Sequence, residues 1–194
     1  MSPTHKALRA GTAEAHDRVD NAFAAFDLTD RAGYAAFLLA HAEVVLPLED
    51  ALAGERVTPD WEERKRGDLL REDLAFLPKP ARLGPVEGQL STSDESSGEP
   101  PFGKLRANGD LAALAGTLYV LEGSRLGGRF LARQLPMGFP RAYLDGNQGA
   151  EKWQQLLVRI DSLLKEPADL QSALAAAHRV FAAFERSAER WTKG

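Results

Sequence analysis

The chain has 194 residues, of which 44% are hydrophobic and 27% charged, which is the composition of one ordinary globular domain with a sizeable core. A formal net charge of −4, with no basic run and no zinc-finger pattern, argues against nucleic-acid binding. The chain has no cysteine, which excludes disulfides, thiolate metal sites and cysteine nucleophiles and fits a reducing, cytoplasmic location. The N-terminus lacks the apolar core of a signal peptide, and no uninterrupted apolar run approaches the roughly 20 residues of a membrane span.

Two long helices are predicted at the start of the chain. Residues 3–24 have good helix propensity, and their apolar side chains recur at three- and four-residue steps. The inward-facing stripe of this helix consists of Leu8, Thr12, Ala15, Val19 and Phe23. The second helix is expected to begin after an N-cap at Thr29 or Asp30 and to run to about residue 53, with a kink or a break at Pro47.

A third helix is predicted over residues 58–77, with Thr58 as its N-cap. Residues 84–109 are different, because they are dense in Gly, Pro and Ser and show neither helical nor strand periodicity. A structureless segment of this length is unusual inside a compact domain, so we expect a disordered insertion here. Apart from this insertion, residues 1–194 are predicted to form a single domain.

The second half of the chain is also predicted to be helical. Helices are expected over residues 110–135, over residues 151–164 and from Glu166 onward, and residues 143–149 are interpreted as a turn-rich connector. No stretch alternates convincingly with a period of two, and hairpin signals are missing. The predicted fold is therefore all-α, a bundle of six or more helices.

Three glycines interrupt the predicted helix 110–135 where it should be most regular. Gly123 and Gly127 lie one turn apart on the same face, and Gly128 lies beside them. Each glycine costs roughly 1 kcal/mol relative to alanine in a helix interior. A stripe of bare backbone either lets a flat ligand approach a helix that can bend there, or admits a second helix at close range. The spacing alone leaves both interpretations open.

Four histidines are candidates for a functional site. His5 is near the N-terminus and is expected to be exposed. His41 and His178 lie on apolar stripes, where a histidine is more often a core residue with a satisfied hydrogen bond than a metal ligand. These three histidines are therefore weaker candidates than His16.

His16 differs from the other histidines in its neighbours. Arg9 lies two turns before it and Asp20 one turn after it, on about the same face of the predicted helix. A carboxylate one turn away can accept the proton of one imidazole nitrogen, directly or through water, which leaves the other nitrogen free to bind a metal. A cation two turns away can meet an anionic part of the same ligand. An aspartate four residues after a histidine is common, so this spacing alone is a weak signal.

Two segments together resemble a known family. The segments Leu8–His16 (LRAGTAEAH) and Tyr119–Gly128 (YVLEGSRLGG) are similar to bacterial haem oxygenases, and in particular to the biliverdin-producing enzymes associated with bacteriophytochromes. The tail from Tyr143 to Phe181 is also similar to that family. The resemblance covers nearly the whole chain outside residues 84–109, and the pairing of the two segments is more specific than either segment alone.

The resemblance implies that haem lies between a proximal N-terminal helix and a kinked distal helix. His16 would then be the axial ligand of the haem iron, and Arg9 and Tyr119 match family positions that contact the propionates. Asp20 matches an acidic position beside the ligand, where the family usually has Glu. Because the aspartate side chain is shorter, we expect it to contact His16 through a water molecule rather than directly.

The resemblance also gives the glycines a role. Gly123, Gly127 and Gly128 would let the backbone of the distal helix lie over the haem face, where a bulky or ligating side chain would occupy the space in which oxygen binds. Ser124 follows the bacterial pattern, whereas the animal enzymes have Asp at this position. Protons would then reach the distal side mainly through ordered water.

The implied activity is the oxidative opening of haem to biliverdin, with release of iron and carbon monoxide. Haem is then both substrate and cofactor, and the reaction needs molecular oxygen. The chain has no flavin or nicotinamide fingerprint, so an external reductant such as a ferredoxin or a flavin reductase would supply electrons, and a bacteriophytochrome would receive the biliverdin. The alternative interpretations are a non-catalytic haem carrier or sensor on the same fold, and a relative that has lost haem.

Overall fold

The computed structural model describes residues 1–78, 110–146 and 150–192, and these residues form helices and connecting turns without a strand. The predicted all-α fold is therefore confirmed for this part of the chain, whereas the insertion predicted at 84–109 lies outside it. The helices are α1 (Pro3–Phe23), α2 (Arg31–Ala51), α3 (Trp61–Arg64), α4 (Gly67–Ala75), α5 (Leu111–Ala132), α6 (Ala142–Asp145), α7 (Ala150–Leu163) and α8 (Pro167–Thr192), and a 3-10 turn, η1, covers Gly54–Arg56.

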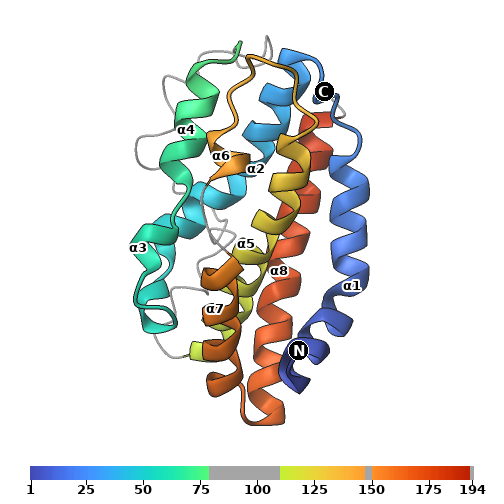
Figure 1. The fold of residues 1–194 in the computed structure, drawn as a ribbon. Coiled ribbons are helices and arrows are strands. Elements are labelled where there is room, and N and C mark those ends of the chain that lie inside the picture. The colour runs from blue at the N-terminus through green and yellow to red at the C-terminus, as the bar shows by residue number, and fades with distance from the viewer. Residues whose placement is uncertain (79–109, 147–149, 193–194) are drawn as a thin grey trace, which may run out of the picture.

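Helices α5 and α8 lie side by side at the centre of the bundle, with α1 on one side and α3, α4 and α6 on the other (Figure 1). Helix α8 also packs against α1 and α2, and α7 packs against α5. The closest approach is made at Gly116 of α5, where a Cβ atom would overlap the backbone carbonyl of Ala173 in α8. The central helix pair therefore depends on a bare backbone at this position.

Helices α1, α2 and α5 each begin directly after a residue whose side chain caps the helix. The side chain of Ser2 accepts a hydrogen bond from the backbone N–H of His5, and the carboxylate of Asp30 accepts one from Gly33. Asp110 caps α5 in the same way. Of the two candidates for the second N-cap, Asp30 is confirmed, because its oxygen satisfies a backbone donor that the helix itself cannot pair.

The prediction of one third helix over residues 58–77 is wrong, because the helical backbone is interrupted between α3 and α4. The carboxylate of Glu49 in α2 accepts hydrogen bonds from the backbone N–H groups of Arg66 (2.7 Å) and Gly67 (2.8 Å). Those two donors therefore point toward α2 and start a new helix. Burial raises the pKa of Glu49, while the two backbone donors and the positive charges of Arg66 and Arg125 lower it.

Two further details of this region differ from the prediction. Helix α2 runs through Pro47 as one helix and ends at Ala51 rather than near residue 53. Thr58 does not cap a helix, because its hydroxyl donates instead to the carboxylate of Asp60 and α3 begins only after Asp60. Helix α2 is also long and apolar enough to cross a membrane by length and composition, but more than half of its apolar window is buried in the bundle, as in a core helix.

The predicted connector 143–149 contains the short helix α6, and residues 147–149 lie outside the described part. The buried carboxylate of Asp73 in α4 accepts hydrogen bonds from the backbone N–H groups of Ala142 (3.0 Å) and Tyr143 (2.9 Å). This contact fixes the start of α6 against α4. As a result, the side chain of Tyr143 is held at a defined place in the interior.

His41 has the satisfied hydrogen bond predicted for it, but it is half-buried rather than part of the core, and it lines a cavity between α1 and α5. Its Nδ1 atom lies 2.9 Å from the carbonyl oxygen of Phe37, and its ring packs against Phe23, Phe37 and Phe184. Burial lowers the pKa of His41 to about 4, partly offset by the hydrogen bond to Phe37. His178 was also expected in the core, but it is exposed, because the buried stripe of α8 runs through Ala177 and Phe181 and His178 lies beside it.

The first prediction tests the contact between α5 and α8. Gly116→Ala is expected to lower the free energy of unfolding by roughly 1–3 kcal/mol, because the added methyl group overlaps a backbone carbonyl. Gly127→Ala is the matched control, since nothing lies within 4 Å of a Cβ atom there. The control is expected to gain up to about 1 kcal/mol from helix propensity. Urea unfolding of the two variants measures the contrast, and equal effects would contradict it.

The second prediction concerns the pH dependence of stability. The folded pKa of His41, about 4, lies below its unfolded value of 6.5. Between these values the unfolded chain binds the proton more readily, so the contribution of His41 to stability is lost as the pH falls from 6.5 to 4. His41→Leu removes this contribution. The difference in unfolding free energy between wild type and variant should fall over that window and be flat above pH 7, and parallel urea melts across the window would contradict the prediction.

Candidate functional site

A cavity of about 620 Å³ lies between α1 and α5, with further walls from α2, α6 and α8. It brings together every residue that the sequence analysis selected: Arg9, His16, Asp20, Tyr119, Gly123, Ser124, Gly127 and Gly128. A second hollow of about 470 Å³ lies between residues 58–60 and α7 and contains none of them. The larger cavity is therefore the candidate site.

His16 enters the cavity from α1 and is held by its neighbour one turn later. Its Nδ1 atom lies 3.1 Å from a carboxylate oxygen of Asp20, so the contact is direct and the expected water bridge is wrong. Residues four apart on a helix are close enough for even a short carboxylate to reach the ring. The imidazole edge also contacts the ring of Phe181, with ring centroids 5.9 Å apart. The arrangement leaves Nε2 of His16 available for a ligand.

The N-terminal end of the cavity has a polar and aromatic rim. Arg9 is exposed there, and Tyr119 and Thr12 line the cavity beside it. His5 was expected to be exposed, but it is half-buried, with its ring about 6 Å from the rings of both Tyr119 and Trp153. Partial burial lowers the pKa of His5, and the positive charges of the N-terminus and Arg9 lower it further.

Gly123, Gly127 and Gly128 of α5 do not share one role. A Cβ atom on Gly127 would meet nothing within 4 Å, and one on Gly123 would lie 3.6 Å from the indole of Trp153. A Cβ atom on Gly128 would lie only 3.1 Å from the carbonyl oxygen of Leu144 in α6. Close helix packing therefore occurs at Gly128 and not at Gly127, which leaves open space beside the helix, and the approach of a flat ligand there stays a prediction.

A buried guanidinium stands beside the glycines, and the sequence analysis missed it. Arg66 is only 4% exposed, and its Nη2 donates hydrogen bonds to the hydroxyl of Ser124 (2.9 Å) and to the carbonyl oxygen of Leu121 (3.1 Å). The hydroxyl of Ser124 donates in turn to the same carbonyl. The guanidinium carbon lies 4.7 Å from the ring centroid of Tyr143. Arg66 falls inside the continuous helix predicted over residues 58–77, and no sequence signal pointed to it.

An ion-pair network anchors α3 to α5 next to this site. The fully buried guanidinium of Arg64 contacts the carboxylates of Asp60 (2.8 Å) and Glu122 (2.9 Å). Arg125 also pairs with Glu122 and donates a hydrogen bond to the backbone carbonyl of Arg64. Burial lowers the pKa of Arg125 to about 10, with a further contribution from the nearby charge of Arg66. The network holds α5 rigidly where Ser124 and the glycines meet the cavity.

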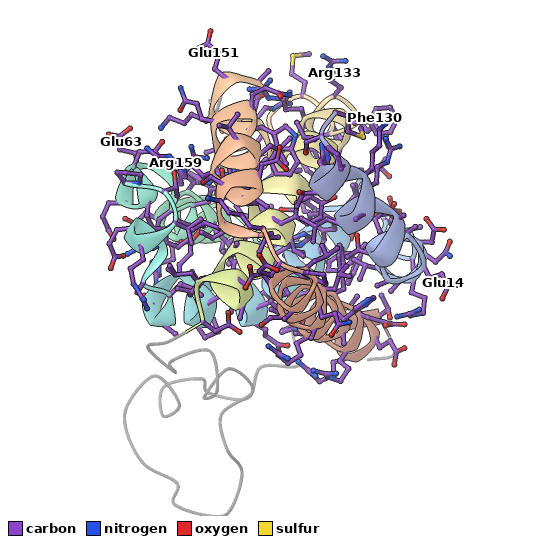
Figure 2. All side chains as sticks on the ribbon, turned by 90° about the horizontal axis from the view of Figure 1, so that it is seen from below. Glu14, Glu63, Phe130, Arg133, Glu151 and Arg159 are labelled. Atoms are coloured by element: carbon purple, nitrogen blue, oxygen red, sulfur yellow. The ribbon has the colours of Figure 1, made fainter. Side chains whose placement is uncertain are left out.

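Near the cavity, α5 exposes apolar side chains to solvent. Leu126 is 52% exposed and lines the cavity, and Phe130, one turn later, is 65% exposed. Figure 2 shows Phe130 close to Arg133 at the surface of the molecule. This half of α5 is therefore covered on one side only, unlike the half that packs on α8.

The metal-binding side chains in the cavity fit a metal that is already held by a larger ligand. Among the described residues, no group of three or more His, Cys, Asp or Glu side chains could hold a metal ion. A porphyrin already supplies four nitrogen ligands to its iron, so one histidine from the protein is sufficient. A cavity of about 620 Å³ also falls in the usual range for cofactor sites.

Comparison with known proteins agrees with this geometry. Residues 2–190 match the protein family described as "Heme oxygenase". A protein named Heme oxygenase from Xanthomonas campestris pv. campestris (strain 8004) is 30% identical over 160 residues, which cover 78% of this chain and 86% of that protein. The family match includes α1 with His16 and α5 with its glycines. The chain therefore belongs to the heme oxygenase family.

Proposed function

We propose that this chain binds haem in the cavity between α1 and α5, with His16 as the axial ligand, and opens it oxidatively to biliverdin. The observation that carries the proposal is the pairing, in one cavity, of a carboxylate-held histidine on α1 with an open glycine position on α5. Membership of the heme oxygenase family supports enzymatic haem degradation rather than haem transport or sensing.

The α1 wall holds and orients the imidazole of His16. Asp20 accepts the Nδ1 proton, which fixes the tautomer and directs Nε2 into the cavity. A carboxylate partner also raises the basicity of the ligating nitrogen. Arg9 and Tyr119, at the N-terminal end of the same cavity, supply a cation and a hydroxyl for the anionic propionates.

The α5 wall leaves one position of the cavity without a side chain. At Gly127 the backbone presents open space, and no side chain there can ligate a metal or exclude a small molecule. Haem, when bound, supplies the iron that activates oxygen and the porphyrin carbon that is oxidised. The chain's own contribution is to orient that group between the two helices and to confine the space beside it.

The remaining partners follow from the chemistry. Molecular oxygen and an external reductant are required, because the chain carries no redox group of its own. We include in the proposal a ferredoxin or flavin reductase as electron donor, a bacteriophytochrome as acceptor of the biliverdin, release of iron and carbon monoxide, and a cytoplasmic location.

The third prediction tests the ligand. His16→Ala is expected to lose the Soret spectrum of a histidine-ligated haem and to lose turnover, because it removes the cavity-lining imidazole that Asp20 contacts. His178→Ala is the matched control, since His178 is exposed and does not line the cavity. Haemin titration followed by an ascorbate-driven biliverdin assay measures both. A wild-type spectrum and full activity in His16→Ala would reject His16, whereas wild-type haem binding without turnover would indicate a carrier or sensor.

The fourth prediction tests which face of α5 meets haem. Gly127→Leu is expected to leave the apoprotein as stable as the wild type or slightly more stable, since the position is open and helices favour leucine over glycine. Haem affinity and turnover should both fall, because the side chain occupies the ligand space. The measurement is a pair of urea melts with and without haem, beside the biliverdin assay. Unchanged haem affinity and turnover would move Gly127 out of the site.

A further inference from the structure

The indole of Trp153 occupies one end of the cavity. Trp153 lines the cavity from α7, whereas the site residues selected from the sequence lie on α1 and α5. Its ring centroid lies 5.6 Å from that of Tyr119 on α5 and 6.0 Å from that of His5 on α1. Figure 1 shows α7 at the same end of the bundle as the start of α1. The indole therefore lies between the two walls of the cavity, at its N-terminal rim.

Trp153 also makes Gly123 and Gly127 unequal as parts of the α5 wall. A Cβ atom on Gly123 would lie 3.6 Å from Cη2 of the indole and 4.0 Å from Cζ3, which is ordinary van der Waals contact. A Cβ atom on Gly127, about 6 Å further along the helix axis, would meet nothing within 4 Å. The bare backbone of α5 is therefore open to a flat ligand at Gly127, whereas the indole covers it at Gly123.

The position of the indole is fixed from two sides of α7. The buried guanidinium of Arg64 donates a hydrogen bond from Nη2 to the carbonyl oxygen of Lys152 (3.1 Å), the residue directly before Trp153. Further along α7, the carboxylate of Asp161 accepts a hydrogen bond from the hydroxyl of Ser2 (2.7 Å). Helix α7 is thus tied both to α3 and to the start of α1, which holds Trp153 at the rim.

The other end of the cavity is lined by aromatic rings. Phe23, the last residue of α1, packs against Phe37, His41 and Phe184, and all four residues line the cavity. Close-packed rings of this kind yield little space to a ligand. A flat ligand between α1 and α5 therefore has room to move mainly toward the rim, where it meets the indole of Trp153.

We propose that Trp153 is a specificity-determining residue, whose indole limits how far a porphyrin extends toward the rim and so seats it against the open backbone at Gly127. The inference rests on the proposed function and adds to it a determinant of haem position. The role depends on the volume of the side chain and needs no hydrogen bond. Because the position of the porphyrin decides which of its edge carbons lies beside Gly127, Trp153 also helps to decide which carbon is oxidised.

The test measures how haem is seated when Trp153 is truncated. Proton NMR of the ferric cyanide complex reports the porphyrin methyl groups, and each seating of the haem gives its own set of signals. Trp153→Ala is expected to add at least one set to those of the wild type. The ratio of the wild-type sets to the new set is expected to be at least about tenfold lower than in the wild type, the effect of losing one large side chain. The biliverdin isomers formed with ascorbate should broaden in parallel.

A size-exchange variant tests whether the volume of the indole is the cause. Gly123→Leu in the Trp153→Ala background returns a side chain to the space that the indole leaves, because that space adjoins the Cβ position of Gly123. The signals and the isomer pattern are expected to move back toward those of the wild type. Trp153→Phe, which keeps a smaller ring, should change them in the same direction as Trp153→Ala but less.

Trp191→Ala is the matched control variant. Trp191 is also a half-buried tryptophan that packs against the core, but it does not line the cavity. Its NMR signals and biliverdin isomers are expected to match those of the wild type. Urea melts of the apoproteins report whether each variant is folded, and Trp153→Phe carries the test if Trp153→Ala is not.

Three results would overturn the role of Trp153. These are wild-type NMR signals in a folded truncation variant, the same new signals in Trp191→Ala, which would mean a general loosening of the bundle, and no return toward the wild type in the size-exchange variant. Failure of the wild-type protein to bind haemin at all would instead reject the proposed function, so the two failures are distinguishable.

Discussion

The bundle depends on how closely other helices approach the backbone of α5. At Gly116 the neighbour is the backbone of Ala173 in α8, and at Gly128 it is the carbonyl of Leu144 in α6. A methyl group would overlap the neighbour at Gly116 and would be tight at Gly128, so these two points limit how α8 and α6 lie against one helix. Next to Gly128 lies Gly127, where nothing comes within 4 Å of a Cβ atom. The open side of α5 at Gly127 therefore borders the cavity, while the neighbouring position packs on α6.

Two buried carboxylates fix the starts of α4 and α6, and these starts position the polar wall of the cavity. Glu49 of α2 pairs with the first backbone donors of α4, and Asp73 of α4 pairs with those of α6. Each carboxylate satisfies two backbone groups that would otherwise be unpaired in the interior, and such pairing of a helix N-terminus with a negative charge is favourable. The side chains that immediately follow these caps are Arg66 and Tyr143. Their positions are consequences of the helix starts, not of their own packing alone.

The sequence could predict features that depend on neighbouring residues, but not features that depend on contacts between residues far apart in the chain. Caps that stand next to their helix, such as Asp30, are visible locally, and the His16–Asp20 pair follows from helical periodicity. The break at Gly67 was missed because the carboxylate that causes it lies 18 residues earlier in the chain. The same is true of Tyr143, whose cap comes from a residue 70 positions away. Apolar periodicity also failed at His178, since it shows which face of a helix is inward on average but does not fix which side of a residue at the edge of that face is buried.

The two walls of the cavity carry charges of opposite sign: a carboxylate on α1 and a guanidinium on the wall formed by α4 and α6. On α1 the imidazole of His16 is backed by the carboxylate of Asp20, which makes the ring a better electron donor. Across the cavity the exposed backbone of α5 is flanked by the buried cation Arg66 and the unpaired hydroxyl of Tyr143. The charge of Arg66, which is only 4% exposed, acts in a low-dielectric interior, whereas the side chains of His16 and Asp20 are more than half exposed and solvent screens their contact. The electrostatic difference between the walls therefore depends mainly on the buried cation. A side chain at Gly127 would enter the open space beside α5 that these groups border.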